Sequence, residues 1–193
     1  LPNAPSSVLV TASTAVVAPY TNQRPVDLGK VTTGSTSFLP ADLQKFSVND
    51  LVVGRREADQ PSVGSGVLTI SGAISSSALR IANGIVLAGT RQMADAGGST
   101  GIAAPSLVMD AGGEVSLIGT GNQIHYFSGV IRDSGLVENA SFTLSSSLTT
   151  SGSATLPLTI GEVFADAAFG TGQRFYQGIT TQNGDIRIFA DQL

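Results

Sequence analysis

The feature that most constrains the fold is a succession of very short apolar segments separated by glycine and asparagine. In residues 106–127 three apolar runs alternate with two small-residue corners: Leu107–Met109, Ala111-Gly112-Gly113, Val115–Ile118, Gly119-Thr120-Gly121-Asn122 and Ile124–Phe127. Short apolar runs bounded by Gly and Asn are typical of β-strands joined by tight turns, not of amphipathic helices. The chain is therefore predicted to be all-β.

The amino-acid composition excludes several classes of function. Only 12% of the 193 residues are charged, so the hydrated surface must consist largely of Ser, Thr, Gly, Asn and Gln. The formal net charge of -4 argues against nucleic-acid binding, which needs a basic surface. The absence of cysteine excludes disulfides, thiolate metal sites and a cysteine nucleophile. No apolar run approaches the ~18 residues of a transmembrane helix, so no transmembrane segment is expected.

The N-terminal part of the chain is rich in proline. Residues 1–30 contain a β-branched stretch at residues 7–18, which predicts either an edge strand or an extended arm that pairs with a neighbouring subunit. Residues 31–62 are expected to be a capping or transition segment, with a short helix over Pro40–Phe46.

Residues 63–193 have the repetitive texture of a β-solenoid. The segments 78–90 (ALRIANGIVLAGT) and 106–120 (SLVMDAGGEVSLIGT) both run strand, small-residue turn, strand, Gly-Thr. A unit of this size cannot bury its apolar face alone, so it is expected to stack as a coil on its neighbours, with Leu79, Leu107 and Val115 in rows. Irregular loops are expected at residues 89–105 and 165–174.

The competing fold is a β-sandwich. Asn83-Gly84 and Asn183-Gly184 are favoured in two-residue hairpins, although the same pairs also suit solenoid corners with positive φ. The run Ile85–Ala88 is apolar at consecutive positions, which favours a strand covered on both faces. The solenoid is therefore preferred, and the β-sandwich is kept as the alternative.

The repeats also support a resemblance to a known family. The runs SLVMDAGGEVSLIGTGNQI and GITTQNGDIRIFADQ resemble the loose repeats in the shafts of filamentous haemagglutinin-like large exoproteins of Gram-negative bacteria. The resemblance covers roughly residues 63–193. It implies a right-handed parallel β-helix, an extracellular or outer-membrane-associated location after secretion, and an adhesive or structural role. No catalytic residue carries over, because the shaft pattern contains none.

No residue is assigned a catalytic, cofactor-binding or metal-binding role. His125 is the sole histidine, and without a G-x-S-x-G elbow it is interpreted as a structural or surface residue. Asp110 and Glu114 flank one turn and form the best carboxylate pair for sugar cleavage, but the chain has no Trp for stacking. Turn chemistry is the preferred interpretation of this pair, and no cofactor is expected.

Partner contacts are expected away from the repeats. The candidates are apolar residues of the N-terminal arm and aromatic residues around the second loop, where an exposed patch would mark an interface. They are Val8, Val10, Phe164, Phe169, Phe175 and Tyr176.

Three function hypotheses follow. The first is a non-enzymatic, secreted bacterial structural or adhesive protein that attaches to surfaces or assembles with itself into fibres, as in a biofilm. Its partners would be further copies, joined head-to-tail or by strand addition, and host or matrix carbohydrate or protein. The alternatives are a carbohydrate-binding or polysaccharide-cleaving β-helix protein, and a β-sandwich fibre subunit joined by strand donation from residues 7–18.

Overall fold

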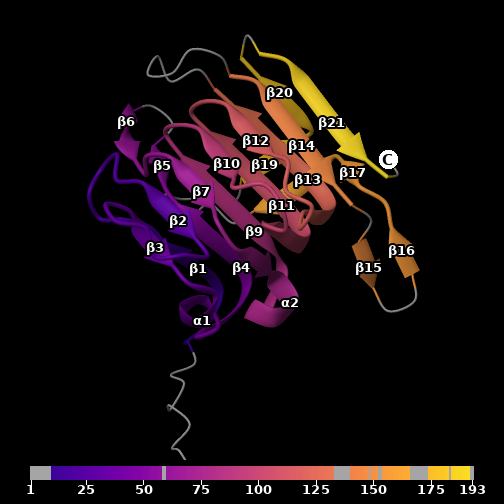
Figure 1. Cartoon of the computed structure of the whole chain (residues 1–193), viewed down its shortest axis with the longest axis horizontal. Coiled ribbons are helices and arrows are strands. Elements are labelled where there is room, and N and C mark those ends of the chain that lie inside the picture. The colour runs from indigo at the N-terminus through magenta and orange to yellow at the C-terminus, as the bar shows by residue number, and fades with distance from the viewer. Residues whose placement is uncertain are drawn as a thin grey trace, which may run out of the picture.

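A computed structural model describes residues 10–57, 60–132, 140–147, 149–151, 154–165, 174–182 and 184–191. The described chain is mostly β-strand and folds around two large sheets that face each other (Figure 1). This confirms the all-β expectation. Every strand pair within the two large sheets is parallel, which is not the pattern that a hairpin-built β-sandwich predicts.

The first sheet, called sheet A, has eight strands. They are, in spatial order, β1 (Val10–Val17), β4 (Phe46–Gly54), β9 (Ile81–Gly89), β11 (Gly101–Ala111), β13 (Gln123–Ile131) and β17 (Thr159–Ile160), with β8 (Ala73–Ser75) also on β11 and β20 (Ile179–Thr181) also on β13. The second, sheet B, has seven strands. They are β21 (Ile186–Ala190), β14 (Phe142–Ser146), β12 (Val115–Leu117), β10 (Met93–Asp95), β7 (Leu68–Ile70), β2 (Val26–Leu28) and β3 (Thr36–Phe38).

Through its middle section the chain alternates between the two sheets. From β9 to β14, each strand of one sheet is followed by a strand of the other, and each new strand pairs with its predecessor in the same sheet. Leu107 of sheet A therefore pairs with Ile85 before it and Phe127 after it. Val115 of sheet B pairs in the same way with Met93 and Phe142. Parallel strands in one sheet require such a crossover, and here the other sheet supplies it.

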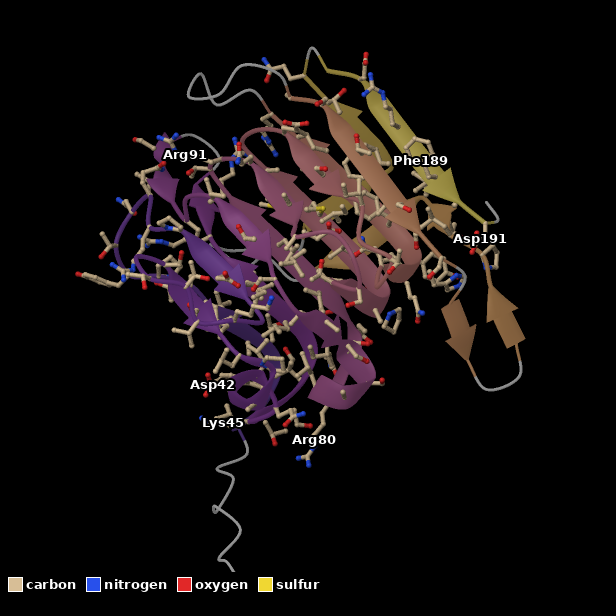
Figure 2. All side chains as sticks on the ribbon, viewed as in Figure 1. Asp42, Lys45, Arg80, Arg91, Phe189 and Asp191 are labelled. Atoms are coloured by element: carbon tan, nitrogen blue, oxygen red, sulfur yellow. The ribbon has the colours of Figure 1, made fainter. Side chains whose placement is uncertain are left out.

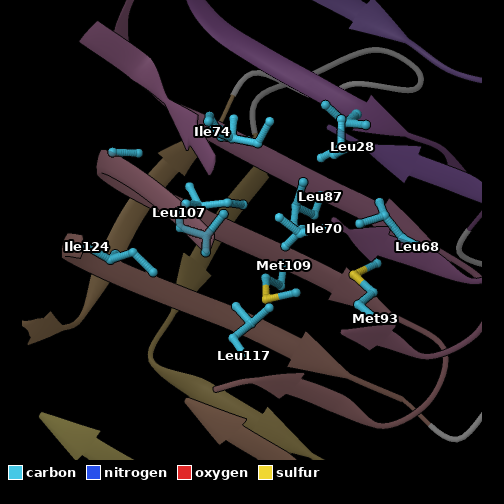
Figure 3. Close-up of a cluster of buried hydrophobic side chains, with 14 of the residues drawn as sticks. Leu28, Leu68, Ile70, Ile74, Leu87, Met93, Leu107, Met109, Leu117 and Ile124 are labelled. Carbon is cyan, nitrogen blue, oxygen red and sulfur yellow. The ribbon is translucent and has the colours of Figure 1, made fainter. Parts of the chain in front are cut away.

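The core fills the space between the sheets with stacked aliphatic side chains (Figure 3). Leu68, Met93, Val115 and Phe142 occupy matching positions on successive strands of sheet B and are all 0% exposed. Fully burying one such side chain contributes about 1.5–3 kcal/mol. The in-register rows therefore hold the stack together.

The long strands of sheet A bend near their middle. Core residues normally alternate along a strand, yet Ala104 and Leu107 are both buried in the core although they lie three positions apart. Ile124 and Phe127 repeat this spacing on the next strand. Two consecutive residues therefore point outward at each bend, and the bends lie beside one another because the strands are in register.

Several detailed expectations were wrong. Residues 89–105 are not one continuous loop: they contain β10 and the start of β11, which pairs with β8, and only residues 90–92 and 96–100 lie outside strands. Asn83-Gly84 is not a hairpin or a positive-φ corner but lies inside β9, where Gly84 leaves room for Ser106 of the next strand. Leu79 lies in helix α2 (Ser76–Leu79), so the residue in register with Leu107 is Ile85.

The sequence predicts a boundary near residue 63, between a capping segment and the repeats. The two sheets show no such boundary. β1, β2, β3 and β4 belong to the same two sheets as the later strands, because their apolar residues are in register with them. β1 is the edge strand of sheet A, as one of the two interpretations of residues 1–30 required. The expected helix is present as α1 (Pro40–Leu43), which begins at a proline and buries Leu43.

In the described part of the chain, three antiparallel hairpins are inserted between the parallel strands. They are β5 (Arg56–Glu57) with β6 (Gln60–Gly64), β15 (Thr149–Ser151) with β16 (Ala154–Leu156), and β18 (Glu162–Ala165) with β19 (Arg174–Gln177). The β15–β16 hairpin projects away from the sheets (Figure 1). The β18–β19 hairpin instead contacts β11 and β13 and is closed at its base, where the Gly178 N–H donates to the Gly161 carbonyl at 3.0 Å.

No helix in the described ranges is long and apolar enough to cross a membrane.

Candidate functional site at the end of the sheets

The two ends of the strand stack differ in how their core is covered. At the N-terminal end of sheet B, Val26 and Leu28 of β2 are only 1% exposed. They are covered because β3 adds one more strand, which places Phe38 beside Leu28, and because α1 inserts Leu43, itself 1% exposed. This end of sheet B is closed.

At the other end of sheet B the core is open. Ile186 of β21 is in register with Phe142 of β14, so it occupies a core position. Phe142 is 0% exposed, whereas Ile186 is 46% exposed. Ile188 and Ala190 pack against the core but are only half-buried, and β21 pairs with no described strand besides β14. One face of an apolar core is therefore uncovered beside a free strand edge.

Among the described strands, β1 at the edge of sheet A pairs only with β4. Its sequence VTASTAVV contains no charged residue, and Val10 and Val16 are 44% and 45% exposed. Charges or prolines commonly protect edge strands from pairing with other chains, and neither lies within β1. The prediction that Val10 is available for a partner contact is compatible with this exposure, but no observation tests the contact itself.

A groove lies beside β21 at the exposed end of sheet B. It has a volume of about 450 Å³ and is lined by Gly119-Thr120, Ser145–Ser147 and Ile188–Asp191. Ser145 is in register with Phe189, which is 60% exposed. The hollow arises because the small side chain of Ser145 lies beside this large ring. Figure 2 shows Phe189 and Asp191 together at the end of β21.

Two of the hydroxyl groups that line the groove donate hydrogen bonds to backbone carbonyl groups. Thr120 Oγ1 donates to the Gly98 carbonyl at 2.9 Å, and Ser147 Oγ donates to the Asn122 carbonyl at 3.2 Å. Each hydroxyl oxygen can still accept hydrogen bonds through its lone pairs. Together with the carboxylate of Asp191, these oxygens make the lining rich in acceptors.

A buried polar network fixes the corner behind the groove. Asn122 is 0% exposed, and its amide donates to Asp95 Oδ2 at 2.8 Å while its Oδ1 accepts from the Ile102 N–H at 2.9 Å. The Gly119 N–H also donates to Asp95 Oδ2, at 2.8 Å. At the end of β14, Ser146 Oγ accepts from the Ile124 N–H of β13 at 3.2 Å. The Gly119–Asn122 corner is therefore held in place by buried hydrogen bonds.

Asp110 and Glu114, the carboxylate pair considered for sugar cleavage, are not both accessible to a ligand. Asp110 is only 3% exposed and accepts a hydrogen bond from Arg56 Nη1 at 2.5 Å, with Arg132 Nε 3.5 Å away. Glu114 is exposed. A carboxylate held in a buried ion pair cannot reach a sugar, so these two residues do not form the site that the hypothesis required.

His125 has a structural contact. Its Nδ1 lies 2.7 Å from the Pro157 carbonyl, and its ring centroid is 4.0 Å from that of Tyr126. Within the described ranges there is no group of three or more His, Cys, Asp or Glu residues that could hold a metal ion.

The structure does not describe the side chains of the other residues predicted to contact a partner. Val8 and Phe169 are outside the described residues. Phe164 lies on β18 opposite Phe175 on β19, and Tyr176 follows on β19, but their side chains are outside the described part of the structure. An exposed aromatic patch around loop 165–174 therefore stays a prediction.

Sequence reasoning missed the open end and the groove. Phe189 and Asp191 lie within the repeat GDIRIFADQ, which was interpreted as a turn plus a strand. The available signal was the alternation in Ile186–Ala190, which puts Phe189 on the side opposite Ile188. Nothing in the sequence marks which strand lacks a neighbour.

Comparisons with known proteins identified no relative of this chain. No family model, no curated protein and no solved structure matches the chain.

Proposed function

We propose that the chain is a parallel β-helix segment with a non-enzymatic structural or adhesive role, which associates with copies of itself through its open end. The proposal includes the secreted, outer-membrane-associated or extracellular location implied by the resemblance to haemagglutinin-like exoproteins. Parallel sheets connected by crossovers in a regular register support the β-helix. The low charge content suits an extracellular surface of hydroxyl and amide groups.

The observation that carries the proposal is the exposure of Ile186. It continues a row of side chains that are fully buried on the preceding strands, yet nearly half of its own surface is open to water. Uncovered core beside a free strand edge is a template for pairing with another chain. The end of a stack of coils therefore acts as the adhesive surface.

The partner that fits this surface best is the same surface of a second copy. Sheet B is closed at its N-terminal end by β3 and α1, so that end does not offer a complementary open core. A two-fold axis passing through Ile188 would pair β21 with its copy in antiparallel orientation. It would keep Ile186, Ile188 and Ala190 on the core side in both copies, since alternate residues share a face. The uncharged edge of β1 would then remain available for extension into fibres.

Light scattering coupled to size-exclusion chromatography tests this association over a wide range of concentration. The wild-type chain is expected to form dimers or larger species as concentration rises, and negative-stain microscopy is expected to show end-to-end particles. Ile186→Lys should shift the distribution to monomers, because each interface would bury two unpaired charges.

Tyr20→Lys is the matched control. Tyr20 is 97% exposed on the turn after β1, so its replacement changes charge equally without touching the open end. It should leave the distribution unchanged. A wild-type chain that stays monomeric at every concentration overturns the proposed self-association, and so does an Ile186→Lys chain that associates like the wild type.

A further inference from the structure

We propose that β1 forms a second contact between copies, in which it pairs antiparallel with the β1 strand of another molecule. This inference deepens the self-association proposed above and rests on it for its role in fibres, but it concerns a different strand. β1 lies at the opposite end of the strand stack from β21 (Figure 1). Among the described strands it pairs only with β4.

The sequence of β1, VTASTAVV, is nearly symmetric about its centre. Its eight residues form four pairs of identical or similar residues at equal distances from that centre. They are Val10 with Val17, Thr11 with Val16, Ala12 with Ala15, and Ser13 with Thr14. A two-fold axis at the centre of the strand would set the members of each pair opposite one another in an antiparallel ladder.

The bend of sheet A gives the two faces of β1 the same symmetry. Ala12 and Ala15 are in register with Val48 and Leu51 of β4, which both point into the core although they lie three positions apart. Positions 10, 12, 15 and 17 of β1 are therefore on the core side, and they are symmetric about the centre of the strand. Two copies of β1 paired about this centre would keep both cores on one side of the joined sheet.

The backbone of β1 is oriented for this pairing. The Val10 N–H donates to the Lys45 carbonyl at 2.8 Å, so at a core-side position the backbone groups face β4. In an extended chain of L-residues, a side chain on the other face places the N–H and C=O on the other edge. Thr11 and Val16 therefore direct their backbone groups away from β4. These two residues are opposite each other in the two-fold pair, where they can exchange both N–H···O bonds.

Charge does not oppose the contact. β1 itself has no charged residue, and Lys45, which precedes β4, is paired with Asp42 at 2.9 Å. Asp50 of β4 is in register with Thr14 and is only 9% exposed. Three strand spacings, about 14 Å, would separate Asp50 from its copy, which exceeds the screening length of about 8 Å at physiological ionic strength.

The β1 contact would complete a fibre. Two different two-fold contacts, one at each end of the stack, join copies into an open chain. The β1 contact covers a strand edge and the half-exposed Val10 and Val16, but no uncovered core. It is therefore expected to be the weaker of the two contacts, and covalent trapping is the suitable way to detect it.

Disulfide trapping tests the contact in the Ile186→Lys background, which removes the association through β21. Thr11→Cys and Val16→Cys are made as separate chains, one of them ¹⁵N-labelled, and are mixed in equal amounts under mild oxidation. Opposite residues of antiparallel strands have Cα atoms about 4.5–5.5 Å apart, within the range of a disulfide. Covalent dimers that join the two variants, identified by mass, are expected to exceed the share given by random pairing several-fold.

Tyr20→Cys is the control partner, because Tyr20 is 97% exposed but lies beyond the end of β1. Its mixture with Thr11→Cys should give only the share expected from random pairing. The inference is overturned if the mixture of Thr11→Cys and Val16→Cys also gives only that share. Because β21 takes no part in this experiment, such a failure is distinct from a failure of the association through the open end.

Val16→Pro in the otherwise natural chain is a second test. Proline removes the N–H that faces the free edge without removing a hydrogen bond to β4, and edge strands tolerate proline at such positions. Assembly is then expected to stop at the dimer formed through β21, as measured by light scattering, with circular dichroism to confirm the fold. Fibres of wild-type length formed by the Val16→Pro chain would overturn the inference.

Discussion

Replacing Asn122 with alanine tests the buried corner where the chain passes from sheet B to sheet A. Asn122 lies at the corner between β12 of sheet B and β13 of sheet A and connects three parts of the chain. Its side chain accepts from the Ile102 N–H and donates to both the Asp95 carboxylate and the Gly119 carbonyl. Asn122→Ala removes all three bonds at a position that water does not reach, because the residue is 0% exposed.

The size of the effect follows from the partners that are left behind. A buried N–H without an acceptor costs about 1–3 kcal/mol, and a lost hydrogen bond to a charged group costs about 1.5–3 kcal/mol. The Ile102 N–H and the Asp95 carboxylate fall in these two classes. The free energy of unfolding should therefore drop by about 3–5 kcal/mol, a large part of the 5–15 kcal/mol typical of folded domains.

Urea unfolding followed by far-ultraviolet circular dichroism measures this change. Asn83→Ala is the matched control, because the Asn83 side chain is exposed and makes no hydrogen bond within the described residues; its effect should stay within about 0.5 kcal/mol. A loss below about 1 kcal/mol for Asn122→Ala, or equal losses for the two variants, would refute the role assigned to the corner.

Three further changes have expected outcomes. Gly112→Ala should lower the unfolding free energy by about 1–3 kcal/mol, because its Cβ would collide with the Thr90 backbone, whereas Gly161→Ala has space and should be tolerated in the same urea assay. Arg56→Met should lower the unfolding free energy by about 1.5–3 kcal/mol, because it removes a buried hydrogen bond to the Asp110 carboxylate while Arg132 Nε remains 3.5 Å away; a loss below about 1 kcal/mol would contradict this. The hydrogen bond from Lys45 lowers the pKa of Asp42 below its ordinary 3.8, so Lys45→Met should raise that pKa in an NMR titration. Since the folded-state pKa is depressed, the small stabilisation is present above pH 3.8 and is lost as the pH falls through the folded-state pKa, and an unchanged pKa would contradict this cause.

The repeated motif predicted the strands but not their partners. Leu107–Met109, Val115–Ile118 and Ile124–Phe127 were identified as strands from their turn residues, and they match β11, β12 and the first half of β13. The motif could not set the register, because several alignments of its Gly-Thr and apolar positions are equally good. Packing decides the register by placing Leu107 beside Ile85, where both side chains reach the core.

The candidate site was not predictable because it depends on which strand lacks a neighbour. Phe142 and Ile186 are similar apolar residues at the starts of similar strands, yet one is fully buried and the other half exposed. The difference lies in the three-dimensional order of the strands. The groove likewise needs Thr120, Ser147 and Phe189 from three successive strands or corners of sheet B, residues that share no local sequence pattern.

Cross-linking through a single introduced cysteine tests the open end most directly. The natural chain has no cysteine, so Ile188→Cys introduces a unique thiol at the centre of β21. Opposite residues of antiparallel strands have Cα atoms about 4.5–5.5 Å apart, within the range of a disulfide. Under mild oxidation the account predicts a covalent dimer for Ile188→Cys and none for Ser116→Cys, which lies inside sheet B. The absence of a dimer for Ile188→Cys, or equal dimer formation by both variants, would contradict it.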